Sequence, residues 1–274
     1  MSAQVMSETM ETMQTGSRNL GRIYALEAKY ELLKMIRLPA YLMPTLIFPL
    51  AFYLLFGVAL RHGGSGTFDF ATYLVATYGA FGVMNAALFG FGVGTAMERG
   101  QGWMLFKRAT PMPPFAWFTG KLAACMACAA VMVASLFTLA ATAGHVHLAA
   151  GQWLSLAGVL VAGTVPFAAF GLAVGSWVGP NAAPAFINLL SLPMAFGSGM
   201  WFPLQMMPGF LRKTAVFLPP YHFAQLALGR IGMGGGPGIG EPALRGVVFL
   251  VVFTAVALYV AWRGYRRDEG KTFG

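Results

Sequence analysis

The sequence predicts an all-α polytopic membrane protein with six transmembrane helices. The 274-residue chain is 57% hydrophobic and only 10% charged, whereas soluble domains carry about 25% charged residues. Residues 122–211 contain no Asp, Glu, Lys or Arg. Uncharged stretches elsewhere are as long as the roughly 20 residues that one helical crossing of a bilayer needs. Lipid is therefore predicted to be the solvent for most of the molecular surface.

The N-terminal part of the chain precedes the first predicted span. Residues 1–17 show no periodicity and are predicted to be disordered. From 18 to 37, apolar residues recur at helical spacing among charged ones, which favours an interfacial helix lying along the membrane surface. A solvated helical extension is the alternative. The uncharged stretch 38–60 is the first predicted span, with kinks at Pro44 and Pro49.

The other five spans are separated by charges, glycines and prolines. They are predicted near 70–97, 116–143, 151–178, 182–203 and 243–262. The short motif Gly90-Phe-Gly-Val-Gly94 lies inside the second span. It resembles a phosphate-binding loop only superficially, because a glycine in an apolar helix more often allows close helix packing.

The distribution of basic residues predicts that both termini are cytoplasmic. Placing the N-terminus inside gives thirteen Lys and Arg on the inner segments and five on the outer ones, as the positive-inside rule requires. The net charge of +9 then reflects topology and indicates no nucleic-acid partner. Tryptophans near predicted span ends form an aromatic belt. These are Trp117, Trp153, Trp177, Trp201 and Trp262.

No constellation typical of an enzyme or a metal site is present. Cys125 and Cys128 lack a second pair, and His145 and His147 lack a third ligand. The chain contains no G-x-x-x-x-G-K-[ST] motif, so it is not expected to bind ATP through a P-loop. No cofactor is predicted for this chain itself.

The predicted spans also lack the intramembrane charges that ion-coupled carriers need. Lys121 is the exception, and it is expected at a membrane boundary because a charge at mid-membrane costs about 2.5–3.5 kcal/mol. A six-span protein without such groups either does no coupled work or takes its energy from a partner. The charged loop at 98–108, between the second and third spans, favours the second possibility.

Two stretches resemble the ABC-2 type permeases, the membrane subunits of a class of ABC exporters. The first is Glu98-Arg99-Gly100-x-Gly102-Trp103 followed by Lys107-Arg108-Ala109-Thr110-Pro111-Met112, which is similar to the first cytoplasmic loop of that family. The second runs from Leu192-Pro193 through Ser198–Pro203 and Met207-Pro208 to Leu218-Pro219-Pro220-Tyr221-His222. It resembles the family's fifth span and the outer re-entrant segment between the fifth and sixth helices.

The resemblance implies a transmembrane domain over 18–265 with a cytoplasmic tail at 266–274. Two such subunits, identical or different, would each sit on a separate P-loop ATPase subunit that binds ATP and Mg. The charged loop would couple the two, through Glu98, Arg99, Gly100, Gly102, Trp103, Lys107 and Arg108. The alternative for Glu98 and Arg99 is that they only anchor a membrane boundary.

The substrate path is expected on the second and fifth spans, which line the dimer interface in the family. Its candidate residues are Phe81, Asn85, Asn188, Ser191 and Phe196. The two asparagines could instead bridge helices. Such a path suits export of an amphipathic or lipophilic drug, natural product or lipid across the cell's inner (plasma) membrane. The alternatives are a permease for a lipid-linked polysaccharide, an ion-coupled carrier, and a membrane assembly factor that transports nothing.

Overall fold

The computed structural model describes residues 3–37, 41, 43–59, 69–103, 113, 115–233 and 242–269. Within these ranges all regular structure is helical. Four helices of the described part of the chain are long and apolar enough to cross a membrane: Phe70–Gly100, Ala116–Thr142, Ala150–Trp177 and Ala243–Arg267. Two shorter apolar helices, Thr45–Ala59 and Ala183–Gly197, stand where the first and fifth spans are predicted. The chain is thus an all-helical polytopic membrane protein, with an apolar helix at each predicted span position.

The elements follow the chain in a simple order. They are α1 (Ala3–Ile36), η1 (Met43–Ile47), α3 (Phe48–Phe52), η2 (Tyr53–Ala59), α4 (Phe70–Ala87), η4 (Leu88–Val93), α5 (Gly94–Gly100), α7 (Ala116–Thr142), α8 (Ala150–Ala162), α9 (Thr164–Trp177), α10 (Ala183–Gly197), η5 (Leu204–Met206), α11 (Gly209–Ala215), α12 (Pro219–Arg230) and α13 (Ala243–Glu269). Here η1, η2 and η4 are π-helical and η5 is a 3₁₀ turn.

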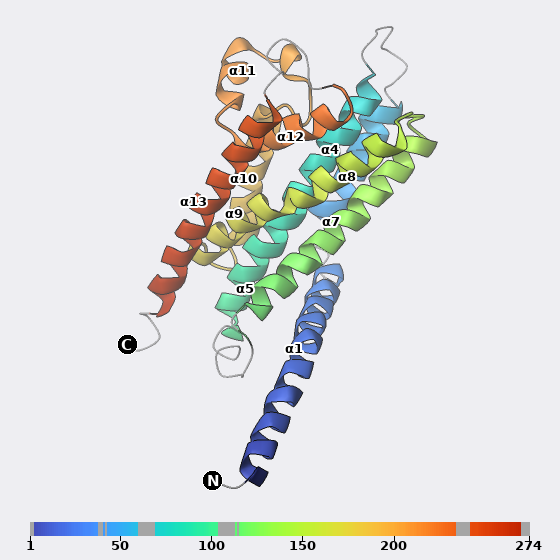
Figure 1. Cartoon of the computed structure of the whole chain (residues 1–274). Helices are drawn as coiled ribbons and strands as arrows, with labels where there is room; N and C mark the ends of the chain where they lie inside the picture. The colour runs from blue at the N-terminus through green and yellow to red at the C-terminus, as the bar shows by residue number, and fades with distance from the viewer. Residues whose placement is uncertain are drawn as a thin grey trace.

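The N-terminal helix is longer than predicted. Helix α1 begins at Ala3, so residues 3–17 are helical rather than disordered. Seven of the fifteen residues of this stretch are Met, Glu or Gln, which have high helix propensity whether or not the helix has an apolar face. In Figure 1, α1 continues outward from the end of the bundle instead of lying across it.

Prolines shorten or distort two of the predicted spans. Pro49 lies in the first turn of α3, between the π-helical segments η1 and η2. Because proline has no N–H to donate, it interrupts the regular hydrogen-bond ladder of an α-helix. In α10, Pro193 lies inside the helix, which ends at Gly197 rather than at the predicted residue 203. The positions 198–233 then form turns and the short helices η5, α11 and α12 where a re-entrant segment is expected.

The second span forms the core of the bundle. In α4 and η4 nearly every residue is buried, including Leu74, Phe81 and Phe91. Helices α7, α9 and α12 pack around it, and α13 packs against α9 and α12. A span buried on all sides needs no polar face, which explains its lack of amphipathic periodicity.

Glycines bring the second span and α9 into backbone contact. A Cβ at Gly175 would lie 2.5 Å from the carbonyl oxygen of Gly92, and one at Gly171 would lie 3.0 Å from the Gly92 nitrogen. The pair Gly171 and Gly175 has the spacing of a G-x-x-x-G packing motif. The glycines of the second span therefore act in helix packing, as the sequence predicts.

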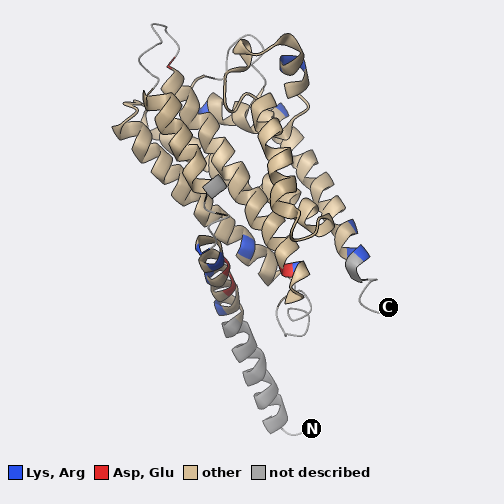
Figure 2. Cartoon of the chain, turned by 180° about the vertical axis from the view of Figure 1, so that it is seen from behind, with Lys and Arg blue, Asp and Glu red and all other residues tan. Residues whose placement is uncertain are grey.

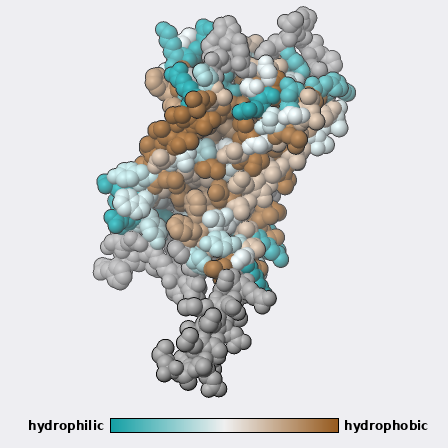
Figure 3. Space-filling view, viewed as in Figure 1, coloured by the Kyte–Doolittle hydropathy of each residue, from teal (hydrophilic) through white to brown (hydrophobic). Residues whose placement is uncertain are grey.

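The two ends of the bundle differ in what they carry. Figure 1 shows the N-terminus, the C-terminus and α5 at one end and α11 and α12 at the other. Charged residues gather near the ends while the body is almost free of them (Figure 2), and hydrophobic side chains cover the middle of the surface in Figure 3. This distribution is typical of a bundle surrounded by lipid between two polar layers.

Candidate functional site: a buried charge cluster beside an apolar pocket

Four charged side chains from three elements meet where α1 reaches the bundle. Glu31 and Lys34 lie in the last turns of α1, Glu98 in α5 and Lys121 in the second turn of α7. Lys121 Nζ lies 2.7 Å from Glu98 Oε1 and 3.4 Å from Glu31 Oε2. Lys34 Nζ lies 2.7 Å from Glu31 Oε2 and also pairs with Glu98 Oε1. We call these four residues the charge cluster.

The charge cluster is neutral overall and largely removed from solvent. Lys121 has no exposed surface, and Glu31 and Glu98 are also buried. Moving isolated charges out of water costs several kcal/mol each, so such groups persist only with excellent partners. The Trp117 Nε1–H supplies one, because it donates to Glu98 Oε2 at 2.8 Å. The cluster therefore holds α1, α5 and α7 in one fixed arrangement.

Close backbone approach lets α1 supply its two members. A Cβ at Gly120 would lie 3.1 Å from the Ala28 nitrogen and 2.7 Å from Glu27 Cγ. The absence of a side chain at Gly120 thus lets α1 pack directly on α7. The face of α1 with Glu27, Glu31 and Met35 turns toward the bundle. This explains why charged residues stand among the apolar positions of the predicted helix at 18–37.

Lys34 is the exposed member of the cluster, with 44% of its side chain accessible. Burial alone would lower the pKa of Lys34, but the carboxylates of Glu98 and Glu31 and their hydrogen bonds raise it above the ordinary 10.5. A raised pKa means that the folded state holds this proton more tightly than the unfolded chain does. The stabilisation by Lys34 is therefore complete below 10.5 and is lost as the pH rises through the folded-state pKa.

We expect the contact of α1 with α7 to be unchanged from about pH 7 to about pH 10 and to loosen above that range. Fluorescent labels on Tyr30→Cys and Thr119→Cys, in a chain with both native cysteines replaced by alanine, would report the distance between the two helices. A Lys34→Met variant should lack the alkaline step that depends on this residue. Loosening near neutral pH would contradict the raised pKa.

The other residues of the predicted coupling loop are distributed differently. Arg99 Nη1 donates to the Gly175 carbonyl oxygen at 2.6 Å, which ties α5 to α9. A Cβ at Gly100 would lie 2.5 Å from Pro180 Cγ, so its close approach is to the turn before α10. Gly102 has a φ of +75°, a conformation that favours glycine. Trp103 is exposed.

Lys107 and Arg108 lie outside the described residues. Of the predicted coupling residues that the structure describes, Glu98, Arg99 and Gly100 contact distant parts of this chain, and Trp103 is more than half exposed. Glu98 and Arg99 therefore fix α5 to neighbouring helices of the same chain. Their coupling to another subunit and their anchoring of a membrane boundary both stay predictions.

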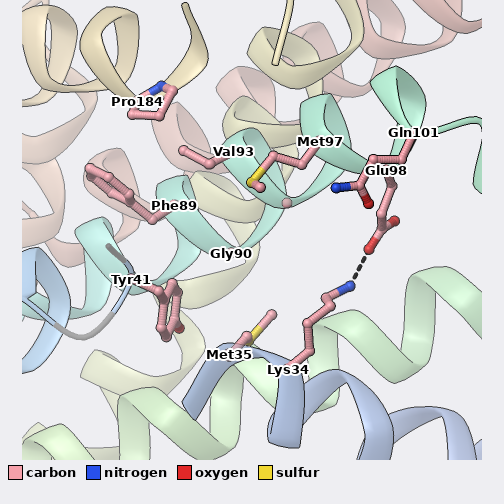
Figure 4. Close-up of a pocket in the computed structure, with 11 residues that line it drawn as sticks. Lys34, Met35, Tyr41, Phe89, Gly90, Val93, Met97, Glu98, Gln101 and Pro184 are labelled. Carbon is pink, nitrogen blue, oxygen red and sulfur yellow. Dashed lines mark hydrogen bonds and ion pairs between the residues drawn. The ribbon is translucent and has the colours of Figure 1, made fainter. Parts of the chain in front are cut away.

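An apolar pocket of about 220 Å³ adjoins the charge cluster (Figure 4). Its polar end is formed by Lys34, Glu98 and Gln101. Six apolar side chains line the rest: Met35, Tyr41, Phe89, Val93, Met97 and Pro184. A cavity of this size, with a charged end and an otherwise apolar lining, suits part of an amphipathic molecule.

The structure separates the candidate substrate-path residues into two groups. Phe81, Asn85 and Ser191 are buried inside the subunit, and Asn85 Nδ2 donates to the Phe81 carbonyl oxygen of its own helix at 2.9 Å. Asn188 and Phe196 instead lie on the exposed face of α10. The five residues therefore do not line one common surface within a single chain.

Sequence reasoning missed three members of the cluster and its hydrogen-bond donor. Glu31, Lys34, Lys121 and Trp117 were not predicted as site residues. One signal was available: Lys121 is the sole charged residue between Arg108 and Arg212, and a lone charge in such a stretch needs a partner. Lys121 is fully buried within the subunit, and its place at a membrane boundary stays a prediction.

Two comparisons relate the chain to known proteins. Residues 60–263 match the family model described as "ABC-2 family transporter protein". The chain is also 24% identical over 230 residues to a protein of Bacillus subtilis (strain 168) named "Putative transport permease YvfS". That alignment covers 84% of this chain and 93% of the relative.

Proposed function

The chain belongs to the ABC-2 family of transporter proteins, and from this premise we propose that it is the membrane-spanning permease subunit of an ATP-driven exporter. The family implies work with an ATPase subunit in general. In our proposal, ATP and Mg bind only to that separate P-loop subunit, and this chain supplies the path through the membrane. The charge cluster is the observation that carries the proposal.

The charge cluster is suited to transmit a displacement. Helix α5 contains the first residues of the charged loop, and its Glu98 is bound to α1 through Lys34 and to α7 through Lys121. Arg99 binds α5 to α9 through the Gly175 carbonyl. A push on the loop by an ATPase would therefore move three neighbouring helices together. Such rigid-body motion is one common way in which a local event switches a membrane bundle between two states.

We propose six spans with both termini cytoplasmic in the inner (plasma) membrane. The two short apolar helices would complete the count, and shorter spans are accommodated by local thinning of the bilayer. The basic residues at the end that carries both termini support the orientation. It places the charge cluster and the charged loop on the side where ATP is available.

A second permease subunit is proposed to cover the exposed face of α10. This face carries Phe186, Leu189, Leu192 and Phe196, with the amide of Asn188 among them. An amide facing hydrocarbon without a partner is costly. A dimer would give Asn188 either a partner side chain or a cargo molecule, whereas the pocket beside the cluster would admit an amphipathic cargo.

The proposal is tested by reconstitution with and without an energy source. The chain would be placed in liposomes alone, or together with a purified P-loop ATPase subunit that binds it, using rhodamine 6G and a fluorescent phospholipid as probes. We expect transport only with the ATPase subunit and ATP. Movement of either probe by the chain alone, under an imposed proton or sodium gradient, would instead identify an ion-coupled carrier.

A third outcome would point to another class of protein. If the chain binds the ATPase but neither probe nor a lipid-linked polysaccharide moves with ATP present, the assembly-factor alternative is favoured. Transport of the polysaccharide alone would correct the cargo class and leave the coupling intact. Trp103→Ala, which removes an exposed side chain of the loop, should weaken binding of the ATPase without disturbing the buried cluster.

A further inference from the structure

Three arginines stand on one face at the C-terminal end of α13. Arg263, Arg266 and Arg267 are spaced by three and four residues, which places them side by side on a helix. All three are exposed. Among the side chains that the structure describes, the salt bridges lie in the charge cluster and none involves these arginines. Their charges are thus available to an external anion.

Each of these arginines lies against an aromatic ring. The guanidinium carbon of Arg266 is 4.6 Å from the ring centroid of Trp262, and that of Arg263 is 5.8 Å from Tyr259. Arg267 lies 5.4 Å from the ring of Trp177, which belongs to α9. Contacts of this kind hold a flexible guanidinium in place while leaving its N–H groups able to donate.

The junction of α9 and α13 fixes this arrangement. Trp177 Nε1 donates to the Val260 carbonyl oxygen at 3.0 Å. A Cβ at Gly264 would lie 2.7 Å from Ser176 Oγ and 2.8 Å from Trp177 Nε1. Only glycine lets the two helices approach this closely, so the ring of Trp177 is locked beside α13 and beneath Arg267.

An apolar strip continues from the arginines along the same helix face. Val252, Val256 and Tyr259 are each more than half exposed. At 3.6 residues per turn, they share one side of α13 with Arg263 and Arg267. The strip and the arginines together match an amphiphile whose anionic head lies at the helix end and whose chains lie along the bundle.

We propose that this surface, the arginine shelf, binds the phosphate headgroup of an anionic membrane lipid. Arginine donates two parallel hydrogen bonds to phosphate oxygens, and guanidinium groups that are already held in place favour this geometry. Basic residues at a helix end also follow from membrane topology. In this surface, however, aromatic rings hold the guanidinium groups at the junction of two helices, and an apolar strip continues from them. Membrane topology requires none of these features, so together they make a defined site.

The test measures lipid binding by the full chain in detergent. Native mass spectrometry would give the dissociation constant of dioleoyl phosphatidylglycerol for the chain and for the triple variant R263Q/R266Q/R267Q. We expect about fivefold weaker binding for each arginine removed, and so roughly 100-fold for the triple variant. The control R212Q/K213Q changes two exposed basic residues of α11 at the other end of the bundle and should bind normally.

Further arms separate the lipid from other anions and from misfolding. Oleate, which is anionic but has no phosphate, should bind more weakly, and millimolar inorganic phosphate should not displace the lipid. Trp177→Leu should weaken binding several-fold while Trp177→Phe preserves it, which a merely structural role of the arginines would not explain. Unchanged affinity of the triple variant, equal loss in the α11 control, or displacement by free phosphate would overturn the proposal.

Discussion

Replacing Glu98 by Gln is expected to destabilise the folded chain by about 3–5 kcal/mol, because it leaves a fully buried lysine without its nearest carboxylate. Lys121 Nζ would retain only Glu31 Oε2 at 3.4 Å, which it shares with Lys34. The glutamine is nearly isosteric, so the loss reports charge rather than packing. Thermal or denaturant unfolding of the purified chain in detergent would measure it.

A second substitution separates charge balance from the loss of one contact. The double variant Glu98→Gln with Lys121→Met removes one charge of each sign and leaves Glu31 paired with Lys34 at 2.7 Å. Replacing both members of a buried pair is often nearly neutral, so we expect this variant to recover much of the stability. If both variants are equally unstable, the cluster is held by shape and not by charge.

The same pair of variants tests the coupling role. In liposomes with the ATPase subunit, Glu98→Gln should allow ATP hydrolysis but reduce transport per ATP hydrolysed, because α5 is no longer bound through charge to α1 and α7. The double variant should recover stability without recovering transport. Lys29→Met, a charge removal at an exposed position of α1, serves as the matched control. Full transport by a stable double variant would leave the cluster a structural anchor only.

The longest elements could be predicted closely because composition alone determines them. The second and third spans were predicted at 70–97 and 116–143, and the helices run Phe70–Gly100 and Ala116–Thr142. An uncharged stretch of this length has few alternatives in a bilayer. The shorter elements could not be placed as well. The ends of α10, and the break at Gly163 between α8 and α9, depend on contacts with other helices. A Cβ at Gly163 would lie 2.1 Å from Phe223 Cε2 of α12.

The charge cluster could be predicted only in part for a related reason. The sequence points to Glu98, and it marks Lys121 as unusual, but it does not say that the two meet. Lys34 and Glu98 are 64 residues apart, and their contact exists because the C-terminal part of α1 packs against α7, beside α5. Helical periodicity describes one helix at a time. It shows charged residues among the apolar positions of α1, but it does not identify the residues of other helices that they contact.

Substituting Gly175 by Leu is expected to have the second large effect, because at that position the backbone of α9 contacts both η4 and α5. The added Cβ would lie 2.5 Å from the Gly92 carbonyl oxygen and 3.0 Å from Thr95 Cβ. A backbone carbonyl cannot turn aside as a flexible side chain can, so α9 must move away from the second span. The shift would also strain the hydrogen bond from Arg99 to the Gly175 carbonyl oxygen. We expect destabilisation at or above the upper end of the about 1–3 kcal/mol typical of overpacking.

The matched control for this change is Gly158→Leu in α8, where an added Cβ meets nothing within 4 Å. Both variants replace a helical glycine by the same side chain, so the gain in helix propensity is equal and only the close approach differs. Unfolding in detergent and the yield of folded chain after extraction should be normal for Gly158→Leu and strongly reduced for Gly175→Leu. Similar results for the two variants would mean that the second span and α9 do not meet through their backbones, and the path by which α5 moves α9 in the proposed mechanism would have to be abandoned.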